Sequence, residues 1–267
     1  MANTVLVGQY VETNSIFHRL DPRTKLLSMI LIMLSFLLLD TLLSYAFATL
    51  FVICILRMSK IPVHVFAKGL KPIVIILMFT FIYNALFTKG TVIWSWSFLE
   101  VTEEGLINGT RLVWRILLLI LLASIVTLTT KPLTLAHGLE KLLSPLSKIY
   151  VPVEQFSLMI VIAIRFIPTI LQEFERILLA QKARGYDISA LKLPQRIFAY
   201  IPVMIPLLLT TIQRAEQLSS AIDSRAYGNG KGRTVYRQLC LQQLDYWAGG
   251  VAVLFAATLV LFKFSGL

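Results

Sequence analysis

The sequence predicts an all-α integral membrane protein with about five transmembrane helices and a charged helical domain inserted before the last of them. Hydrophobic residues make up 57% of the 267 residues, above the roughly 45–50% of globular chains, and the mean hydropathy is +0.77. Basic segments separate long apolar runs. The formal charge of +11 therefore indicates cytoplasmic loops beside anionic lipid headgroups and no nucleic acid partner.

The first helix is expected to begin at Asp21-Pro22, an N-cap residue followed by proline at the first helical position. Arg23 and Lys25 follow and are expected near the membrane surface. The first 20 residues are mixed polar and contain no continuous apolar region. We therefore expect no cleavable signal peptide.

The next apolar region, residues 26–56, contains Asp40 as its one charged residue. Its 31 residues exceed the roughly 20 that one span needs. We expect two short or tilted helices that turn at Asp40-Thr41 on the outer surface. A basic segment over residues 57–72 follows and is expected in the cytoplasm, and residues 73–87 form the third span.

Residues 89–111 are expected to form an outer loop that lies against the interface through Trp94 and Trp96. Residues 112–130 return as the fourth span, in which Arg115 must snorkel outward or pair, for instance with a loop glutamate. Residues 246–262 form the last span. The resulting topology places the N-terminus in the cytoplasm.

Residues 131–240 contain 14 of the 25 Lys and Arg residues and 7 of the 14 Asp and Glu residues. This number of charges is too high for the bilayer core and too low for a freely soluble domain. Two of its stretches, residues 156–171 and 197–212, are mainly apolar and interrupted by prolines. We expect a cytoplasmic or interfacial helical domain. The predicted organisation is a membrane domain over 1–130, this domain over 131–240, and a transmembrane helix over 241–267.

Two tripeptides in that domain, Ala183-Arg184-Gly185 and Ser224-Arg225-Ala226, each end a helix-like segment. Each places an always-charged guanidinium with five donors beside small residues, where a partner can approach the backbone. The structural alternative is a plain helix C-terminus, with Arg favouring the macrodipole and Gly185 as the C′ cap. The two interpretations are compatible, because a capped helix end is a rigid platform for an arginine.

Other candidate sites have weaker signals. The three histidines are dispersed, Cys54 and Cys240 lie far apart, and no metal site, disulfide, cofactor or catalytic arrangement is expected. The glycine-rich segment 228–234 has the wrong spacing for an ATP-binding loop. Asp40 and Arg165 lie within apolar runs, so the alternative function is a stand-alone secondary transporter that uses them in an ion pathway.

Residues 15–25, Ser-Ile-Phe-His-Arg-Leu-Asp-Pro-Arg-Thr-Lys, resemble the entry signature of the energy-coupling factor (ECF) transporter transmembrane T component, the EcfT/CbiQ family. The matching positions are His18, Asp21, Pro22, Arg23 and Lys25. Ala183-Arg184-Gly185 matches the family's usual Ala-Arg-Gly motif, and Ser224-Arg225-Ala226 is a looser match. The resemblance covers nearly the whole chain in the same order.

The resemblance implies a non-catalytic subunit of an ABC-type importer in a prokaryotic plasma membrane. Its implied partners are two cytoplasmic ABC-type ATPases, the same or different, and a membrane-embedded substrate-binding S component that captures a vitamin or other micronutrient. Arg184 and Arg225 would each dock on one ATPase, and residues 131–240 would be coupling helices that transmit ATP-driven motion.

Overall fold

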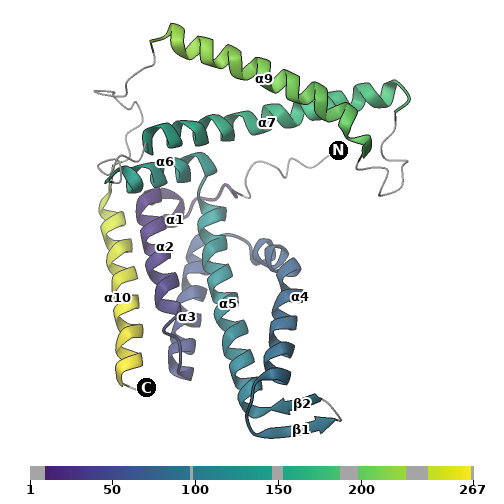
Figure 1. Cartoon of the computed structure of the whole chain (residues 1–267). Helices are drawn as coiled ribbons and strands as arrows, with labels where there is room; N and C mark the ends of the chain where they lie inside the picture. The colour runs from purple at the N-terminus through teal and green to yellow at the C-terminus, as the bar shows by residue number, and fades with distance from the viewer. Residues whose placement is uncertain (1–9, 97–98, 146–152, 187–197, 227–239, 266–267) are drawn as a thin grey trace. The chain divides into compact units, whose positions relative to one another are not determined.

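The computed structural model describes residues 10–96, 99–145, 153–186, 198–226 and 240–265. The glycine-rich segment 228–234 lies outside these residues. The chain divides into two compact units, which we call the bundle unit (residues 8–142 and 239–267) and the crossed-helix unit (residues 1–7 and 143–238). The described residues form helices and one two-stranded hairpin (Figure 1).

The bundle unit begins with α1 (Ile16–Arg19), α2 (Pro22–Phe36) and α3 (Leu42–Ser59). The predicted start of α2 is confirmed: the Asp21 carboxylate accepts a hydrogen bond from the Arg23 backbone N–H at 2.9 Å, and Pro22 occupies the first helical position. The predicted turn at Asp40-Thr41 is confirmed as well, because Thr41 and Ser44 form a reciprocal capping box that starts α3.

The next segment is α4 (Val63–Phe87), then strands β1 (Val92–Trp96) and β2 (Leu99–Thr102), then α5 (Glu103–Thr129). The sequence predicted a loop up to residue 111, but an antiparallel hairpin forms and α5 begins at Glu103. β-branched and aromatic residues favour the strands. The Thr102 hydroxyl accepts from the Gly105 N–H at 3.2 Å, which caps the helix, and two glutamates in its first turn favour the helix dipole.

Helices α4 and α5 approach closely through two glycines spaced four apart. A Cβ on Gly105 would lie 2.6 Å from the Asn84 carbonyl oxygen, and one on Gly109 would lie 3.3 Å from Phe81. Small residues at this spacing allow membrane helices to pack backbone against backbone. The pairing fixes α4 along α5 (Figure 1).

The last helix, α10 (Gln243–Ser265), packs against α2 and returns the end of the chain to the bundle. Phe255 of this helix is buried and lies against three aromatic rings. The ring centroids of Phe51 and Phe47 are 4.0 and 5.3 Å away in stacked geometry, and Phe36 is 6.0 Å away edge-on. Aromatic contacts therefore join the first and last parts of this unit.

Helix α6 (Pro132–Leu143) follows α5, and the crossed-helix unit then contains α7 (Val153–Ala183) and α9 (Ile201–Ser224). The prolines at 168 and 206, which interrupt the apolar stretches, lie inside these helices and do not end them. Near the C-terminal part of α7, Phe174 stacks on Tyr200 at 6.4 Å, and Ala199 and Val203 are buried in the same cluster. Figure 1 shows the two helices crossing.

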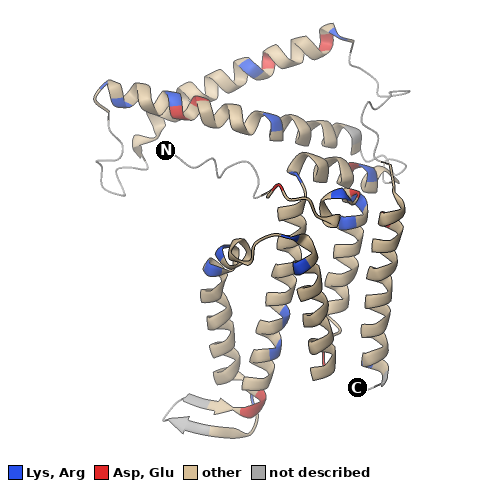
Figure 2. Ribbon diagram, turned by 180° about the vertical axis from the view of Figure 1, so that it is seen from behind, with Lys and Arg blue, Asp and Glu red and all other residues tan. Residues whose placement is uncertain are grey.

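Five helices among the described residues are long and apolar enough to cross a membrane, and they include parts of α3, α4, α5, α7 and α10. The sequence also predicted five spans, but it counted the segment that forms α2 and did not count α7. Helix α2 has 15 residues, fewer than the roughly 17–25 of a typical span. Helix α7 satisfies length and composition, although it is more amphipathic than α10. Figure 2 shows charges of both signs spread along α7 and α9.

Candidate functional site

The first arginine tripeptide forms a complete helix C-cap. Helix α7 ends at Ala183, and Gly185 adopts a left-handed φ of 86°. The Gly185 N–H donates to the Lys182 carbonyl and the Tyr186 N–H donates to the Gln181 carbonyl, both at 3.0 Å. These two bonds define a Schellman motif. The predicted C′ role of Gly185 is confirmed, and Arg184 lies exposed at the cap position.

The second tripeptide repeats this geometry with a different residue. Helix α9 ends at Ser224, Arg225 is the cap, and Ala226 takes the left-handed position with a φ of 51°. The Ala226 N–H donates to the Asp223 carbonyl at 2.9 Å, as Gly185 does to Lys182. Arg225 is exposed, as is Arg184. Both arginines therefore precede a residue in the left-handed conformation whose N–H bonds the carbonyl three positions earlier.

The N-terminal motif begins with a hydrogen-bonded histidine. His18 Nε2 lies 2.9 Å from the Val11 carbonyl oxygen, which can only accept, so this nitrogen donates. Its Nδ1 lies 2.7 Å from the Ser15 hydroxyl, which donates to it when the ring is neutral. The Val11 N–H in turn bonds the Leu128 carbonyl at 3.0 Å. His18 thus holds the N-terminal segment against the end of α5.

The rest of the motif joins a buried polar cluster. Lys25 is only 6% exposed, and its ammonium donates to the Thr130 hydroxyl at 2.9 Å and the Thr129 carbonyl at 3.3 Å. The Asp21 backbone N–H donates to Asp245 Oδ1 at 2.7 Å across 224 positions of sequence. Arg23 lies at the edge, with Nε 3.9 Å from Asp21. The sequence predicted the motif but not Asp245, because no local signal links it to Asp21.

Asp40 and Arg165 belong to different units. Asp40 lies in the α2–α3 turn with 57% of its side chain exposed. It is 3.7 Å from Arg115 and 3.4 Å from Lys263, and Arg115 also donates to the Leu39 carbonyl. Arg165 is exposed on α7 in the other unit. Arg115 therefore pairs with Asp40, whereas the sequence suggested a loop glutamate as its partner.

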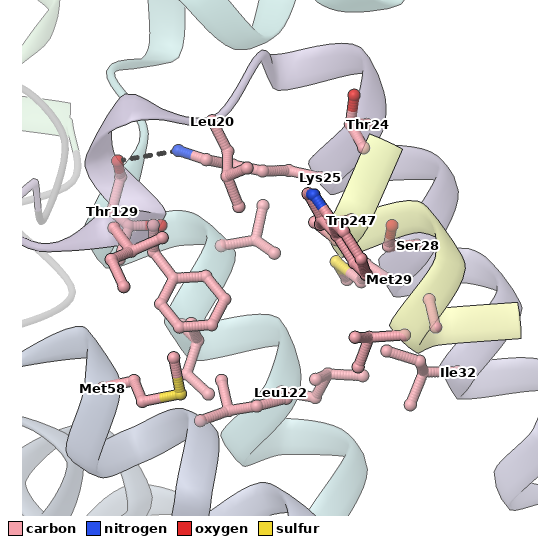
Figure 3. Close-up of a pocket in the computed structure, with 18 of the residues that line it drawn as sticks. Leu20, Thr24, Lys25, Ser28, Met29, Ile32, Met58, Leu122, Thr129 and Trp247 are labelled. Atoms are coloured by element: carbon pink, nitrogen blue, oxygen red, sulfur yellow. Dashed lines mark hydrogen bonds between the residues drawn. The ribbon is translucent and has the colours of Figure 1, made fainter. Parts of the chain in front are cut away.

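A cavity of about 390 Å³ lies between α2, α3, α5 and α10. Figure 3 shows Lys25 at its edge, hydrogen-bonded to Thr129, with Trp247 and Met29 nearby. Most of the other lining residues are apolar, among them Ile32, Met58 and Leu122. Binding sites for polar ligands combine an apolar wall with several convergent polar groups. This cavity instead suits apolar groups.

Metal-binding and thiol chemistry have little basis in the described ranges. These residues contain no cluster of three or more His, Cys, Asp or Glu side chains that could hold a metal ion. Cys54 and Cys240 are free and exposed. The best-defined candidate sites among the described residues are therefore the two arginine helix ends and the buried N-terminal motif.

Comparisons with known proteins identify the family of the chain. The family model described as CbiQ, cobalt transport protein, matches residues 13–236, from the N-terminal motif through both arginine helix ends. The chain belongs to the EcfT/CbiQ family. The transmembrane protein EcfT of the energy-coupling factor transporter of Ruminiclostridium cellulolyticum is 40% identical over 264 residues, which cover 99% of each chain.

Two further EcfT proteins show the same full-length similarity. That of Lactococcus lactis is 44% identical over 242 residues, covering 90% of this chain and 91% of the relative. That of Bacillus subtilis is 40% identical over 240 residues with the same coverage. This EcfT/CbiQ protein is thus a multi-pass membrane protein, the non-catalytic transmembrane T component of an ECF transporter. The predicted fold class and function are confirmed.

Proposed function

We propose that this T component joins two cytoplasmic ABC-type ATPases to a membrane-embedded S component that captures a vitamin or other micronutrient. Each exposed arginine, Arg184 and Arg225, docks on one ATPase. Closure and opening of the ATPase pair then move α7 and α9, and this motion reaches the S component through the bundle unit. ATP binding and hydrolysis belong to the partner subunits.

The observation that carries this proposal is the repeated helix end. Two arginines occupy the same backbone position, each followed by a residue in the left-handed conformation. A helix end fixed by its own capping bonds presents a guanidinium with little loss of backbone freedom on binding. Two equivalent ends suit two related docking grooves, which a pair of homologous ATPases would provide.

The same proposal assigns the topology. Residues 131–240 and the N-terminus face the cytoplasm, and α7 and α9 lie at the membrane interface. The amphipathic character of α6, α7 and α9 supports this placement, since an interfacial helix needs one apolar and one polar face. The apolar length of α7 would also permit a crossing, so the placement requires the topology measurement described below.

The test replaces each arginine and then both. Loss of one partner from a buried charged contact costs about 2–5 kcal/mol, whereas a second tethered contact preserves much of the binding. Arg184→Ala and Arg225→Ala alone should weaken co-purification of the ATPases with the chain from its native membrane. The double variant should abolish co-purification, while the amount of chain in the membrane stays unchanged.

Arg176→Ala is the matched control. Arg176 is an exposed arginine on α7, 3.7 Å from Glu173, and lies away from the helix end. It should leave ATPase recovery as in the wild type. Full recovery of ATPases with the double arginine variant would refute the docking role of both residues.

The structure gives no support to an ion pathway through Asp40 and Arg165. Asp40 is an exposed turn residue with two cationic neighbours, and exposed ion pairs contribute about 0–1 kcal/mol. Asp40→Asn should leave the assembled complex and its ATP hydrolysis within about twofold of the wild type. A loss of transport in this variant, with the complex intact, would favour the ion pathway instead.

A further inference from the structure

The chain passes twice between the bundle unit and the crossed-helix unit. Where each passage joins the bundle unit, it adjoins the N-terminal motif. The first leaves the bundle unit at residue 142, in the last turn of α6, and the second returns at residue 239. Within the bundle unit, α6 and the start of α10 both contact Asp21-Pro22. These two residues and Lys25 are called the anchor below.

The first passage contacts the anchor through a glycine. Gly138 of α6 lies so close to Pro22 that an added Cβ would be 2.9 Å from the proline Cβ and 3.2 Å from its Cγ. Contacts below 3.0 Å require a shift, and here the neighbour is a rigid ring. Just before α6, Thr129 and Thr130 bind the Lys25 ammonium. The two parts of the chain that precede this passage, the end of α5 and helix α6, are therefore both held on α2.

The second passage contacts the anchor through Asp245. Its Oδ1 accepts from the Asp21 N–H and its Oδ2 accepts from the Gln242 N–H, each at 2.7 Å. The second bond caps the first turn of α10, so one carboxylate both starts α10 and attaches it to the N-terminus of α2. Asp245 is 3% exposed, which makes these bonds poorly accessible to competing water.

The charges of the cluster depend on one another. Burial lowers the pKa of the Lys25 ammonium to about 8, and the Asp245 and Asp21 carboxylates partly offset this by favouring its charged form. A buried charge is costly unless it is paired and hydrogen-bonded. Removal of the Asp245 charge would leave less nearby negative charge to stabilise the Lys25 ammonium. The hydrogen bonds of the whole cluster should therefore weaken together.

We propose that the N-terminal motif is the mechanical attachment of the two passages, and that Asp245 and Gly138 are positioning residues that hold each passage on it. This inference rests on the proposed function, because it concerns how movement of the crossed-helix unit reaches the bundle unit. When the anchor is intact, both passages move with α2. When one passage is detached, movement of α7 and α9 dissipates before it reaches the bundle.

The test uses the complex purified with its ATPases in lipid nanodiscs. Cys54 and Cys240 are replaced by serine, and spin labels are attached at Leu179→Cys in the crossed-helix unit and Leu42→Cys in the bundle unit, both exposed positions. The distance distribution between the labels is measured without nucleotide and after trapping with ATP and vanadate. The unmodified anchor should give a narrow distribution that shifts on trapping.

Asp245→Asn and Gly138→Ala should each broaden that distribution at least twofold and at least halve the shift, while ATP hydrolysis stays within twofold. The first variant keeps the side-chain size and removes the charge, and the second leaves every charge in place. If the complex with Asp245→Asn fails to assemble, the result for Gly138→Ala decides the test. Wild-type width and shift in Gly138→Ala would overturn the inference.

Two matched controls separate positioning from general destabilisation. Asp40→Asn removes an ion-paired carboxylate elsewhere in the bundle unit, and Gly249→Ala adds a Cβ that meets no atom of the described residues within 4 Å. Neither should change the distribution, and broadening in both would also overturn the inference. A parent complex that binds no ATPase, or shows no shift, would instead contradict the proposed function.

Discussion

At the scale of single residues, Gly185 and Ala226 occupy equivalent positions with different conformational costs. Both have a positive φ, which glycine adopts freely and which costs an L-residue roughly 1–2 kcal/mol. Among the described residues, no neighbour lies within 4 Å of a Cβ built on Gly185, so its requirement there is for conformation and not for space. The second helix end is therefore the more strained copy of the first.

Exchange of the two residue types should have opposite effects. Ala226→Gly should stabilise the last turn of α9 by about 1 kcal/mol and Gly185→Ala should destabilise the last turn of α7 by a similar amount. Amide hydrogen exchange should accordingly slow about fivefold at the end of α9 in Ala226→Gly and accelerate about fivefold at the end of α7 in Gly185→Ala. Gly249→Ala in α10 serves as the control for a glycine outside a cap. Changes of the same sign at both ends would contradict the strain argument.

At the scale of elements, the helices of the bundle unit are held by rings and close backbone contacts. Association of helices in lipid gains little from the hydrophobic effect, so packing and polar contacts decide it. Phe255 contacts rings from α2 and α3, and Gly105 and Gly109 admit α4. Loss of a packed ring should therefore matter more than loss of an apolar residue that faces lipid.

Phe255→Ala should destabilise the bundle unit by about 2–3 kcal/mol. This is below the roughly 3–5 kcal/mol of a soluble core, because lipid replaces water as the reference environment. Unfolding by SDS in mixed micelles measures the difference. Phe264→Ala is the matched control on the same helix, since Phe264 is 86% exposed, and it should change the unfolding free energy by less than about 0.5 kcal/mol. Equal losses of stability in Phe255→Ala and Phe264→Ala would show that the aromatic contacts of Phe255 do not hold α10 in the bundle.

Sequence predicted those elements whose signals are local. Asp21-Pro22, the turn after Asp40 and the Gly185 cap each depend on residues a few positions apart, and the structure contains all three. The early start of α5 was missed because its acidic first turn resembled a loop. The contact of Asp21 with Asp245 spans 224 positions and has no local signal, so only the folded chain reveals that part of the site.

At the scale of the whole molecule, the proposed topology places both passages between the units on the cytoplasmic side. Cys240 lies in the second passage and is exposed, whereas Cys54 lies within the candidate span of α3. A membrane-impermeant maleimide should label Cys240 of the Cys54→Ser variant in inside-out vesicles and not in intact cells. Cys54 of the Cys240→Ser variant should remain unlabelled in both. Labelling of Cys240 in intact cells would invert the topology.

The off-centre crossing of α7 and α9 gives their two ends unequal arms. The contact involves Ile177 and Val203, so at 1.5 Å per helical residue Arg184 lies roughly 10 Å and Arg225 roughly 33 Å along its helix from the contact. On the proposed function, equal displacements of the two ATPases would act at different radii about this pivot. Their turning effects would not cancel, so a symmetric closure would become a net rotation of the pair.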